Sequence, residues 1–146
     1  MFWEGPGYAT KLNNRLTKEL YVEALEDELM ASLEYYGKEV DDFIFMYDNA
    51  SSHKAGLVRN WLADKGIEVL EWPACSPYLN PIEHLWTRLK RELGKYPHPP
   101  KGVLELLERV ETEWNKIDAK VCQDLIESMP RRIQAVLKAK GGHTDY

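Results

Sequence analysis

The sequence is poor in cysteine, in long apolar runs and in net positive charge. Two cysteines in 146 residues are too few for the disulfide framework of a small secreted protein. No apolar run approaches the roughly 18 residues that would cross a bilayer. The opening stretch MFWEGPGYATKLNN also lacks the basic and apolar regions of a signal peptide. We therefore expect an intracellular protein without a membrane segment.

The charge is acidic overall but unevenly distributed along the chain. A net charge of −5 argues against a general coat for nucleic acid. Residues 1–83 carry 7 basic and 15 acidic groups, a balance of −8, whereas residues 84–146 carry 12 basic and 9 acidic groups, a balance of +3. The second half could meet a polyanion locally, although solvated helix faces would give the same pattern.

The apolar pattern predicts a single α/β domain in which strands and helices alternate. A continuous apolar run in one of the expected strands, Phe43–Tyr47, indicates burial on both faces, and hence parallel pairing. In the expected helix at 52–65, Leu57, Trp61 and Leu62 point inward. Strands are expected from Gly7, at Phe43–Tyr47 and at Ile67–Trp72, and helices at 17–36, 52–65, 81–93, 102–116 and 119–139. Since function gathers at the carboxyl ends of parallel strands, Asp48 and the loop after Trp72 are the places to search.

That loop contains EWPACSPYLNPIEHLW, whose acid Glu83 has two interpretations. The structural one is helix capping, with Asn80 as N-cap, Pro81 at the first helical position and Glu83 reaching back to the N-cap amide. The functional one is metal binding. Asp48 and Glu83 could converge on one hard divalent ion, which prefers carboxylate oxygens.

The motifs around these two acids resemble the DDE transposases of the Tc/mariner family. DNASSHKA, beginning at Asp48, resembles the family's Asp-Asn-Ala…His motif. WPACSPYLNPIE, ending at Glu83, resembles its Trp-Pro-Ala-x-Ser-Pro-Asp-Leu-Asn-Pro-Ile-Glu motif. The 34 residues between the acids match the spacing of one branch, and the resemblance extends over nearly the whole chain. Tyr78 departs from the family pattern, which has Asp there.

The resemblance implies a ribonuclease H-like fold and magnesium- or manganese-dependent cutting and joining of DNA at transposon ends. Asp48 matches the second catalytic, metal-binding acid and Glu83 the third. His53 matches the family's His, with a structural or DNA-proximal role. DNA is the implied partner, and the nucleus the implied location if the source is eukaryotic. DNA contacts are expected from Asn49, His53, Arg88, Lys90 and Arg91, the last three being suited to phosphates.

We expect residues 1–146 to be a partial catalytic domain, because the family's first Asp, its first two strands and its helix-turn-helix region have no counterpart here. The chain alone is then predicted neither to cleave nor to join DNA, while a weak metal site at Asp48 and Glu83 persists. The strand at Phe43–Tyr47 would present a bare edge, which favours self-association or pairing with another chain. The alternative is a domesticated, non-catalytic protein that binds DNA or another protein.

Other interpretations have less support. A serine hydrolase would lack the Gly-x-Ser-x-Gly elbow, and a zinc site would lack Cys-x-x-Cys spacing. The hydrolase would use Ser76, His53 and Asp48, and the zinc site Cys75, Cys122, His53 and His84. Trp61, Trp86 and Trp114 lie at helical positions beside apolar neighbours, which favours core packing over base stacking.

Overall fold

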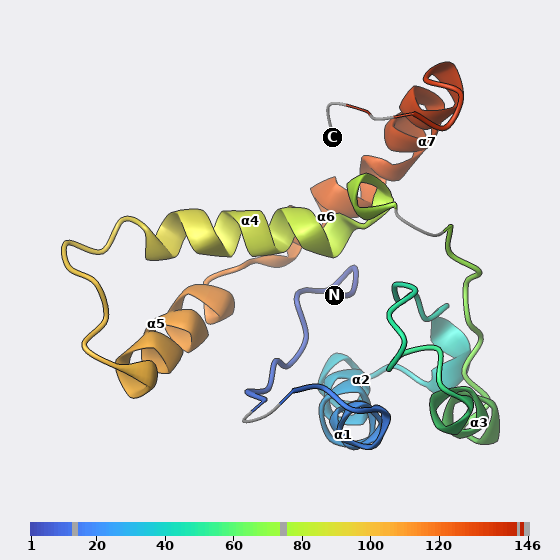
Figure 1. The fold of residues 1–146 in the computed structure, drawn as a ribbon, viewed down its shortest axis with the longest axis horizontal. Helices are drawn as coiled ribbons and strands as arrows, with labels where there is room; N and C mark the ends of the chain where they lie inside the picture. Colours follow the sequence, from blue (N-terminus) through green and yellow to red (C-terminus); the bar gives the residue numbers. More distant parts are fainter. Residues whose placement is uncertain (13–14, 74–75, 143, 145–146) are drawn as a thin grey trace. The chain divides into compact units, whose positions relative to one another are not determined.

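The chain forms two units, each with its own apolar core. The computed structural model describes residues 1–12, 15–73, 76–142 and 144. One unit is Gly7–Ser76, and the other joins Met1–Pro6 to Pro77–Tyr146. Figure 1 shows the elements along the chain. Among the described residues, no helix is long and apolar enough to span a membrane.

The first unit begins with one continuous helix in three segments, as predicted for 17–36. These are α1 (Lys18–Ala24), the π-helical turn η1 (Leu25–Leu29) and α2 (Met30–Tyr36). Thr17 caps the start by accepting a hydrogen bond from the Leu20 amide at 3.3 Å. Gly37 ends the helix in the left-handed region, at φ 61°, where a residue without a Cβ is favoured.

The second helix of this unit, α3 (Gly56–Asp64), begins later than predicted. A short 3₁₀ turn, η2 (Val40–Asp42), precedes it. The inward positions of α3 are Val58 and Leu62, which are one turn apart, are both buried and pack against Leu25 of the first helix. The prediction for Leu62 is confirmed, whereas the prediction for Leu57 is wrong because that side chain is exposed.

The predicted strands do not extend into a sheet within the described residues. Phe45 and Val69 form an isolated parallel bridge. The Phe45 amide donates to the Glu68 carbonyl at 2.7 Å, and the Leu70 amide donates to the Phe45 carbonyl at 2.9 Å. The parallel direction is thus confirmed, but the predicted lengths at Phe43–Tyr47 and Ile67–Trp72 are wrong. Two strands alone rarely sustain a ladder in water, because they bury too little apolar surface.

The segment after Gly7 also forms no strand within residues 7–12. Instead the Tyr8 amide donates to the Ser32 hydroxyl at 2.8 Å. The Tyr8 ring lies edge-on to Tyr35 at 5.7 Å. These contacts attach the segment to α2, so its backbone is partly satisfied by side chains rather than by a neighbouring strand. The rest of that predicted strand, residues 13–14, lies outside the described residues.

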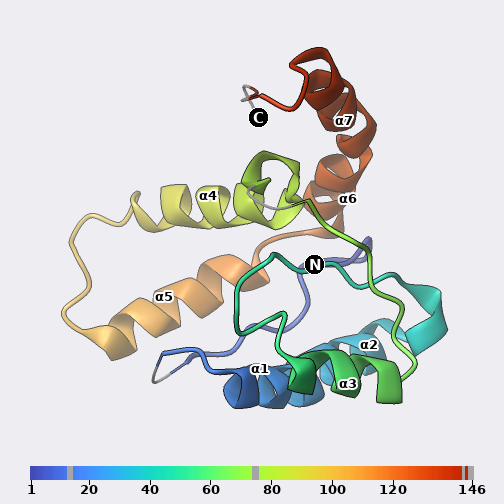
Figure 2. The same cartoon turned by 45° about the vertical axis from the view of Figure 1, so that its right-hand side comes forward.

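The second unit is a set of helices after the 3₁₀ turn η3 (Pro77–Leu79). α4 (Pro81–Leu93) and α5 (Val103–Asn115) lie side by side in both views (Figures 1 and 2) and agree with the prediction. The predicted helix at 119–139 is instead two, α6 (Ala119–Glu127) and α7 (Met129–Lys138). Pro130 explains the break at Ser128, because it has no amide to donate to the preceding turn.

The core of this unit lies between α4, α5 and α6. Leu85 and Leu89 of α4 pack against Trp114, Ile117 and Cys122. Leu85 and Leu89 are one turn apart, which turns the opposite side of α4, including Glu83, Lys90 and Arg91, toward solvent. The core therefore fixes which side of α4 is available to a ligand.

Candidate metal and nucleic-acid site

Asp48 follows the bridged segment and has one carboxylate oxygen engaged by neighbours. Its Oδ1 accepts a hydrogen bond from the Ala50 amide at 3.0 Å and lies 2.5 Å from Nδ1 of His53. The Asp48 side chain is 58% exposed. The turn therefore fixes the carboxylate while leaving its second oxygen accessible.

His53 is packed rather than presented to solvent. Its ring stacks on Tyr21 of α1, with centroids 4.0 Å apart and an interplanar angle of 26°, and it meets Tyr47 edge-on at 6.3 Å. Only 17% of the side chain is exposed. Burial, followed by the nearby charge of Asp48 and by Tyr47, raises the pKa of Tyr21. The stack holds His53 against Asp48. The predicted contact between His53 and DNA stays a prediction.

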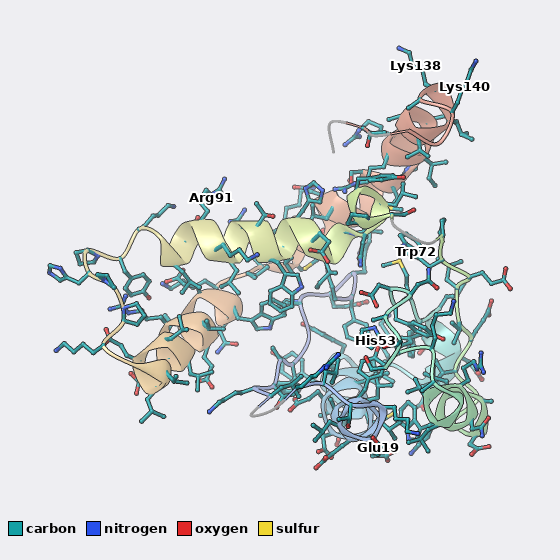
Figure 3. All side chains as sticks on the ribbon, viewed as in Figure 1. Glu19, His53, Trp72, Arg91, Lys138 and Lys140 are labelled. Atoms are coloured by element: carbon teal, nitrogen blue, oxygen red, sulfur yellow. The ribbon has the colours of Figure 1, made fainter. Side chains whose placement is uncertain are left out.

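Asn49 connects the loop after Asp48 to the end of the second bridged segment. Its Nδ2 donates to the Trp72 carbonyl at 2.9 Å. Figure 3 labels both His53 and Trp72. This bond brings together two chain segments 23 residues apart, as expected for loops at the carboxyl ends of neighbouring parallel segments. Asn49 thus shapes the loop, and its predicted DNA contact is untested.

Glu83 lies on the first turn of α4. The capping prediction is confirmed for Asn80 and Pro81 but not for Glu83. The Asn80 side chain accepts from the Ile82 amide at 3.3 Å, and Pro81 takes the first helical position. The Asn80 amide, which a capping box would pair with Glu83, donates instead to the Pro77 carbonyl at 3.0 Å. Capping therefore does not account for the exposed carboxylate of Glu83.

Arg132 supports the turn that leads into α4, a role the sequence did not indicate. It is 2% exposed. Its Nη1 donates to the Tyr78 carbonyl at 2.9 Å, and its Nε donates to the Ser128 hydroxyl at 2.7 Å. Tyr78 replaces the family's Asp, but the contact uses its backbone, so the substitution leaves this bond intact. α7 thereby braces the segment that carries Asn80 and Glu83.

The three predicted phosphate-binding residues are all exposed on α4. Arg91 extends away from the helix (Figure 3) and lies 3.6 Å from the Glu92 carboxylate. Lys90 is two helical turns after Glu83 and thus on the same side. Arg88 is turned by about 140° from Glu83. Lys90 is therefore better placed than Arg88 for a ligand that also meets Glu83.

The donor chemistry of the two acids fits a hard divalent ion. Both offer carboxylate oxygens, the type that magnesium and manganese prefer. Asp48 belongs to the unit Gly7–Ser76 and Glu83 to the other unit, so their convergence on one ion remains a prediction. Within the described part of the chain, no three His, Cys, Asp or Glu side chains cluster as a metal site. The two acids would need a further ligand.

The alternative zinc site is not supported by the residues that can be described. Cys75 lies outside the described residues. Cys122 is fully buried in the core of its unit, and burial raises the pKa of its thiol. A thiol held in its protonated form is a poor zinc ligand, because the thiolate is the form that binds.

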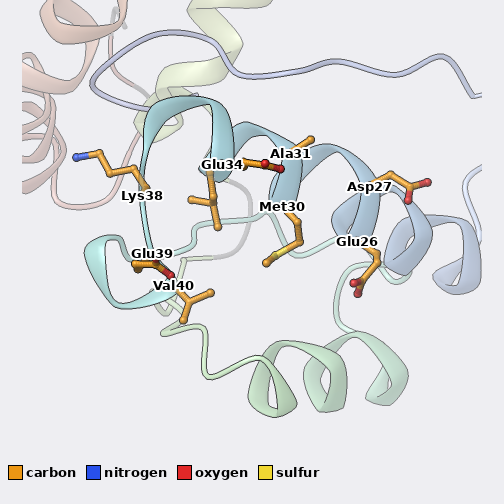
Figure 4. A pocket seen from close by; sticks show the side chains of 9 residues that line it. Glu26, Asp27, Met30, Ala31, Glu34, Lys38, Glu39 and Val40 are labelled. Atoms are coloured by element: carbon orange, nitrogen blue, oxygen red, sulfur yellow. The ribbon is translucent and has the colours of Figure 1, made fainter.

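A hollow of about 530 Å³ lies beside the first helix, in the unit Gly7–Ser76. Its charged lining residues are Glu26, Asp27, Glu34, Lys38 and Glu39. In Figure 4 the side chains of Asp27 and Lys38 point away from each other on opposite sides of the hollow. Among the described residues, the acids of this hollow do not converge as ligands of one ion would.

Exposed acids such as Asp48 and Glu83, and exposed basic residues such as those of α4, are the kinds of side chain that proteins use to hold metal ions and to bind nucleic acid. The sequence model of the DDE superfamily endonucleases matches residues 4–102. The chain belongs to this family, and the matched region includes both Asp48 and Glu83.

Its relatives are transposases of transposable elements. The Tcb1 transposase of Caenorhabditis briggsae is 42% identical over 109 residues, covering 71% of this chain and 37% of that protein. The Tc3 transposase of Caenorhabditis elegans is 31% identical over 135 residues, covering 92% of this chain and 40% of that protein. The chain thus spans well under half the length of these relatives.

The fold is that of transposase catalytic domains. The catalytic domain of the Mos1 mariner transposase matches with a TM-score of 0.85 at 24% identity, covering 98% of this chain and 72% of that one. A form of that domain with raltegravir and manganese matches with the same TM-score. A Mos1 paired-end complex with the left transposon end also gives 0.85, at 22% identity, covering 97% of this chain and 42% of that one. The predicted ribonuclease H-like fold agrees with these neighbours, whereas the predicted α/β sheet is not seen in the described residues.

Proposed function

We propose that this chain is part of the catalytic domain of a Tc/mariner transposase. Such an enzyme cleaves and joins DNA at transposon ends, in the nucleus if the source is eukaryotic. One observation carries the proposal: the region matched by the family includes Asp48 and Glu83 together. Relatives named as transposases, and Mos1 complexes named for transposon ends, support DNA as the substrate.

The proposed architecture is α/β, with the Phe45–Val69 bridge as the remnant of a parallel sheet. In the strand order of the ribonuclease H-like fold, the third strand corresponds to the segment from Gly7. The fourth corresponds to Phe43–Tyr47 and the fifth to Ile67–Trp72. Each unit would supply part of one catalytic domain. The parallel direction of the bridge and the likeness to Mos1 support this assignment.

In this proposal Asp48 and Glu83 hold magnesium or manganese. The ions, when bound, would polarise the phosphodiester and activate the attacking oxygen. His53, fixed by its stack on Tyr21, keeps the Asp48 carboxylate in one orientation, as outer-shell partners of metal ligands do. Asn49 holds the adjoining loop.

The exposed basic side chains Arg88, Lys90 and Arg91 would bind DNA phosphates. Such contacts are independent of base sequence and weaken as salt rises. They would position the strand along α4, whose first turn carries Glu83.

The residues that match the family's motifs include two catalytic acids, whereas the family's chemistry needs three. We therefore propose that the 146-residue chain alone binds DNA and metal without cutting DNA. A domesticated DNA-binding protein would share this behaviour.

The test measures manganese binding by electron paramagnetic resonance and strand cleavage on a pre-nicked duplex, using the 146-residue chain. We expect weak manganese binding that falls at least fivefold in Asp48→Asn and in Glu83→Gln, with no cleavage. Asp64→Asn is the matched control, because Asp64 is an exposed acid at the end of α3, and it should bind like the wild type. Equal binding by all four proteins would contradict the assigned metal ligands. Metal-dependent cleavage that Asp48→Asn abolishes would show that a third ligand is present in the chain.

A further inference from the structure

Trp61, Trp86 and Trp114, for which the sequence predicts the same core packing, have different environments. Trp114 is buried in the core of its unit. Trp61 is half-buried, and its indole donates to Glu26 at 2.7 Å. Trp86, by contrast, is 37% exposed although it lies next to the fully buried Leu85. Core packing is therefore confirmed for Trp114 and for the partly buried Trp61, whereas Trp86 packs on Trp114 but is more exposed than predicted.

The exposed ring of Trp86 is held in a fixed orientation by its neighbour. It stacks on Trp114 of α5, with ring centroids 4.9 Å apart and an interplanar angle of 25°. Because the Trp86 indole stacks on the buried Trp114 indole, it has little conformational freedom to lose when a ligand binds. A flat ligand that packs on it consequently pays a small entropic cost.

Trp86 lies on the same side of α4 as the acid and the lysine of the candidate site. It follows Glu83 by three residues and precedes Lys90 by four, and side chains at these spacings are neighbours on a helix. Lys90 is exposed and has no ion pair among the described residues. One side of α4 thus presents a carboxylate, a fixed aromatic ring and a cation in sequence.

We propose that Trp86 is a stacking platform for an unpaired nucleobase of the DNA substrate, with Lys90 contacting a neighbouring phosphate. This inference rests on the proposed function, because it takes DNA as the ligand of α4. An unpaired base is the occupant that fits, since any base offers a flat face once it leaves the duplex. A paired base has both faces covered by its neighbours. The cation beside the ring complements the charge of the strand.

The experiment compares two fluorescent DNAs by anisotropy in magnesium and low salt. One is a blunt duplex, and the other has the same sequence with a single-stranded overhang of four nucleotides. We expect Trp86→Leu to weaken binding of the overhang DNA about five- to tenfold and binding of the blunt duplex by less than twofold. Trp86→Phe, which keeps an aromatic face on Trp114, should retain most of the affinity. Tyr35→Leu, at an exposed aromatic residue of α2, is the control and should bind both DNAs normally.

Several results would overturn the proposal. If Trp86→Leu binds the overhang DNA like the wild type, no base stacks on this ring. If Trp86→Phe and Trp86→Leu lose affinity for both DNAs equally, with melting curves that show a loosened fold, the residue has only a structural role. A wild-type chain that binds neither DNA would overturn the proposed DNA function itself. A wild-type chain that binds both DNAs with no effect of the Leu variant would overturn only the platform.

Discussion

Arg132 is a cationic side chain that the fold places out of water, 2% exposed. Removing a guanidinium from water carries a large cost unless hydrogen bonds offset it. Here the offset includes the bonds to the Tyr78 carbonyl and the Ser128 hydroxyl. Since Tyr78 lies two residues before the N-cap of α4, these bonds connect α7 to the turn that presents Glu83.

Arg132→Met should therefore lower the free energy of unfolding of this unit. Methionine fills similar space but leaves the Tyr78 carbonyl without this donor, which costs roughly 1–3 kcal/mol. Arg131→Met is the matched control, because Arg131 is exposed one position earlier in the same helix. The control should change stability by no more than about 0.5 kcal/mol. Urea denaturation followed by tryptophan fluorescence measures both, and an equal effect of the two substitutions would refute the brace.

For individual residues, the sequence indicated those of the motifs but not the residues that hold them in place. Asp48, Asn80 and Glu83 were identified because the motif and the capping pattern are local. The Tyr21–His53 stack and the Arg132–Tyr78 bond join residues 32 and 54 positions apart. Spacing along a chain carries no information about such contacts. A buried arginine in a helix with exposed basic neighbours also reads, in sequence, as one more solvated charge.

At the scale of elements, one carboxylate of the first helix bonds to two side chains at α3, beside the apolar contacts of the core that both helices share. Glu26, in the π-helical turn η1, accepts from the Trp61 indole at 2.7 Å and from the Lys65 ammonium at 2.7 Å. A π turn shifts the side chains that follow it around the helix. The hydrogen bonds to Lys65 and Trp61 lower the pKa of Glu26 from its ordinary value of 4.5.

This lowered pKa predicts an acid-sensitive contribution to stability. The folded state favours ionised Glu26, so the contribution is present above pH 4.5 and is lost as pH falls through the lower pKa of the folded state. Glu26→Gln should be less stable than the wild type at pH 7 and should approach it near pH 3. Glu23→Gln, at an exposed acid one turn earlier, should follow the wild type throughout. Thermal melts from pH 3 to pH 7 would measure this, and parallel pH curves for Glu26→Gln and the wild type would exclude the contribution.

The helices could be predicted and the strands could not, for a physical reason. A helix satisfies its backbone within itself, so caps such as Thr17, Gly37 and Asn80 mark its ends in the sequence. A strand depends on partners that the local sequence does not contain. The runs at Phe43–Tyr47 and Ile67–Trp72 have the composition of buried strands, yet they pair only at Phe45 and Val69 in the described residues.

At the scale of the whole molecule, this short pairing leaves apolar side chains without cover. Ile44, Val69 and Leu70 are exposed although they lie in or beside the bridge. Phe45 pairs with the segment from Glu68 to Leu70 on one edge. In the described residues, no strand pairs with its other edge. An open edge flanked by apolar side chains is a site for pairing with another chain.

We expect the 146-residue chain to associate through this edge as its concentration rises. Sedimentation velocity between about 5 and 100 μM should show a shift toward larger species, because the backbone groups of Ile44 and Met46, which flank the bridged Phe45, can pair with a second copy. Ile44→Lys should reduce this association, since a charge beside the edge opposes pairing. Leu57→Lys is the matched control, because it places the same charge at an exposed apolar residue of α3, and it should leave association unchanged. A monomer at every concentration, with a sharp cooperative thermal transition, would show instead that the two bridged segments are sufficient without a partner.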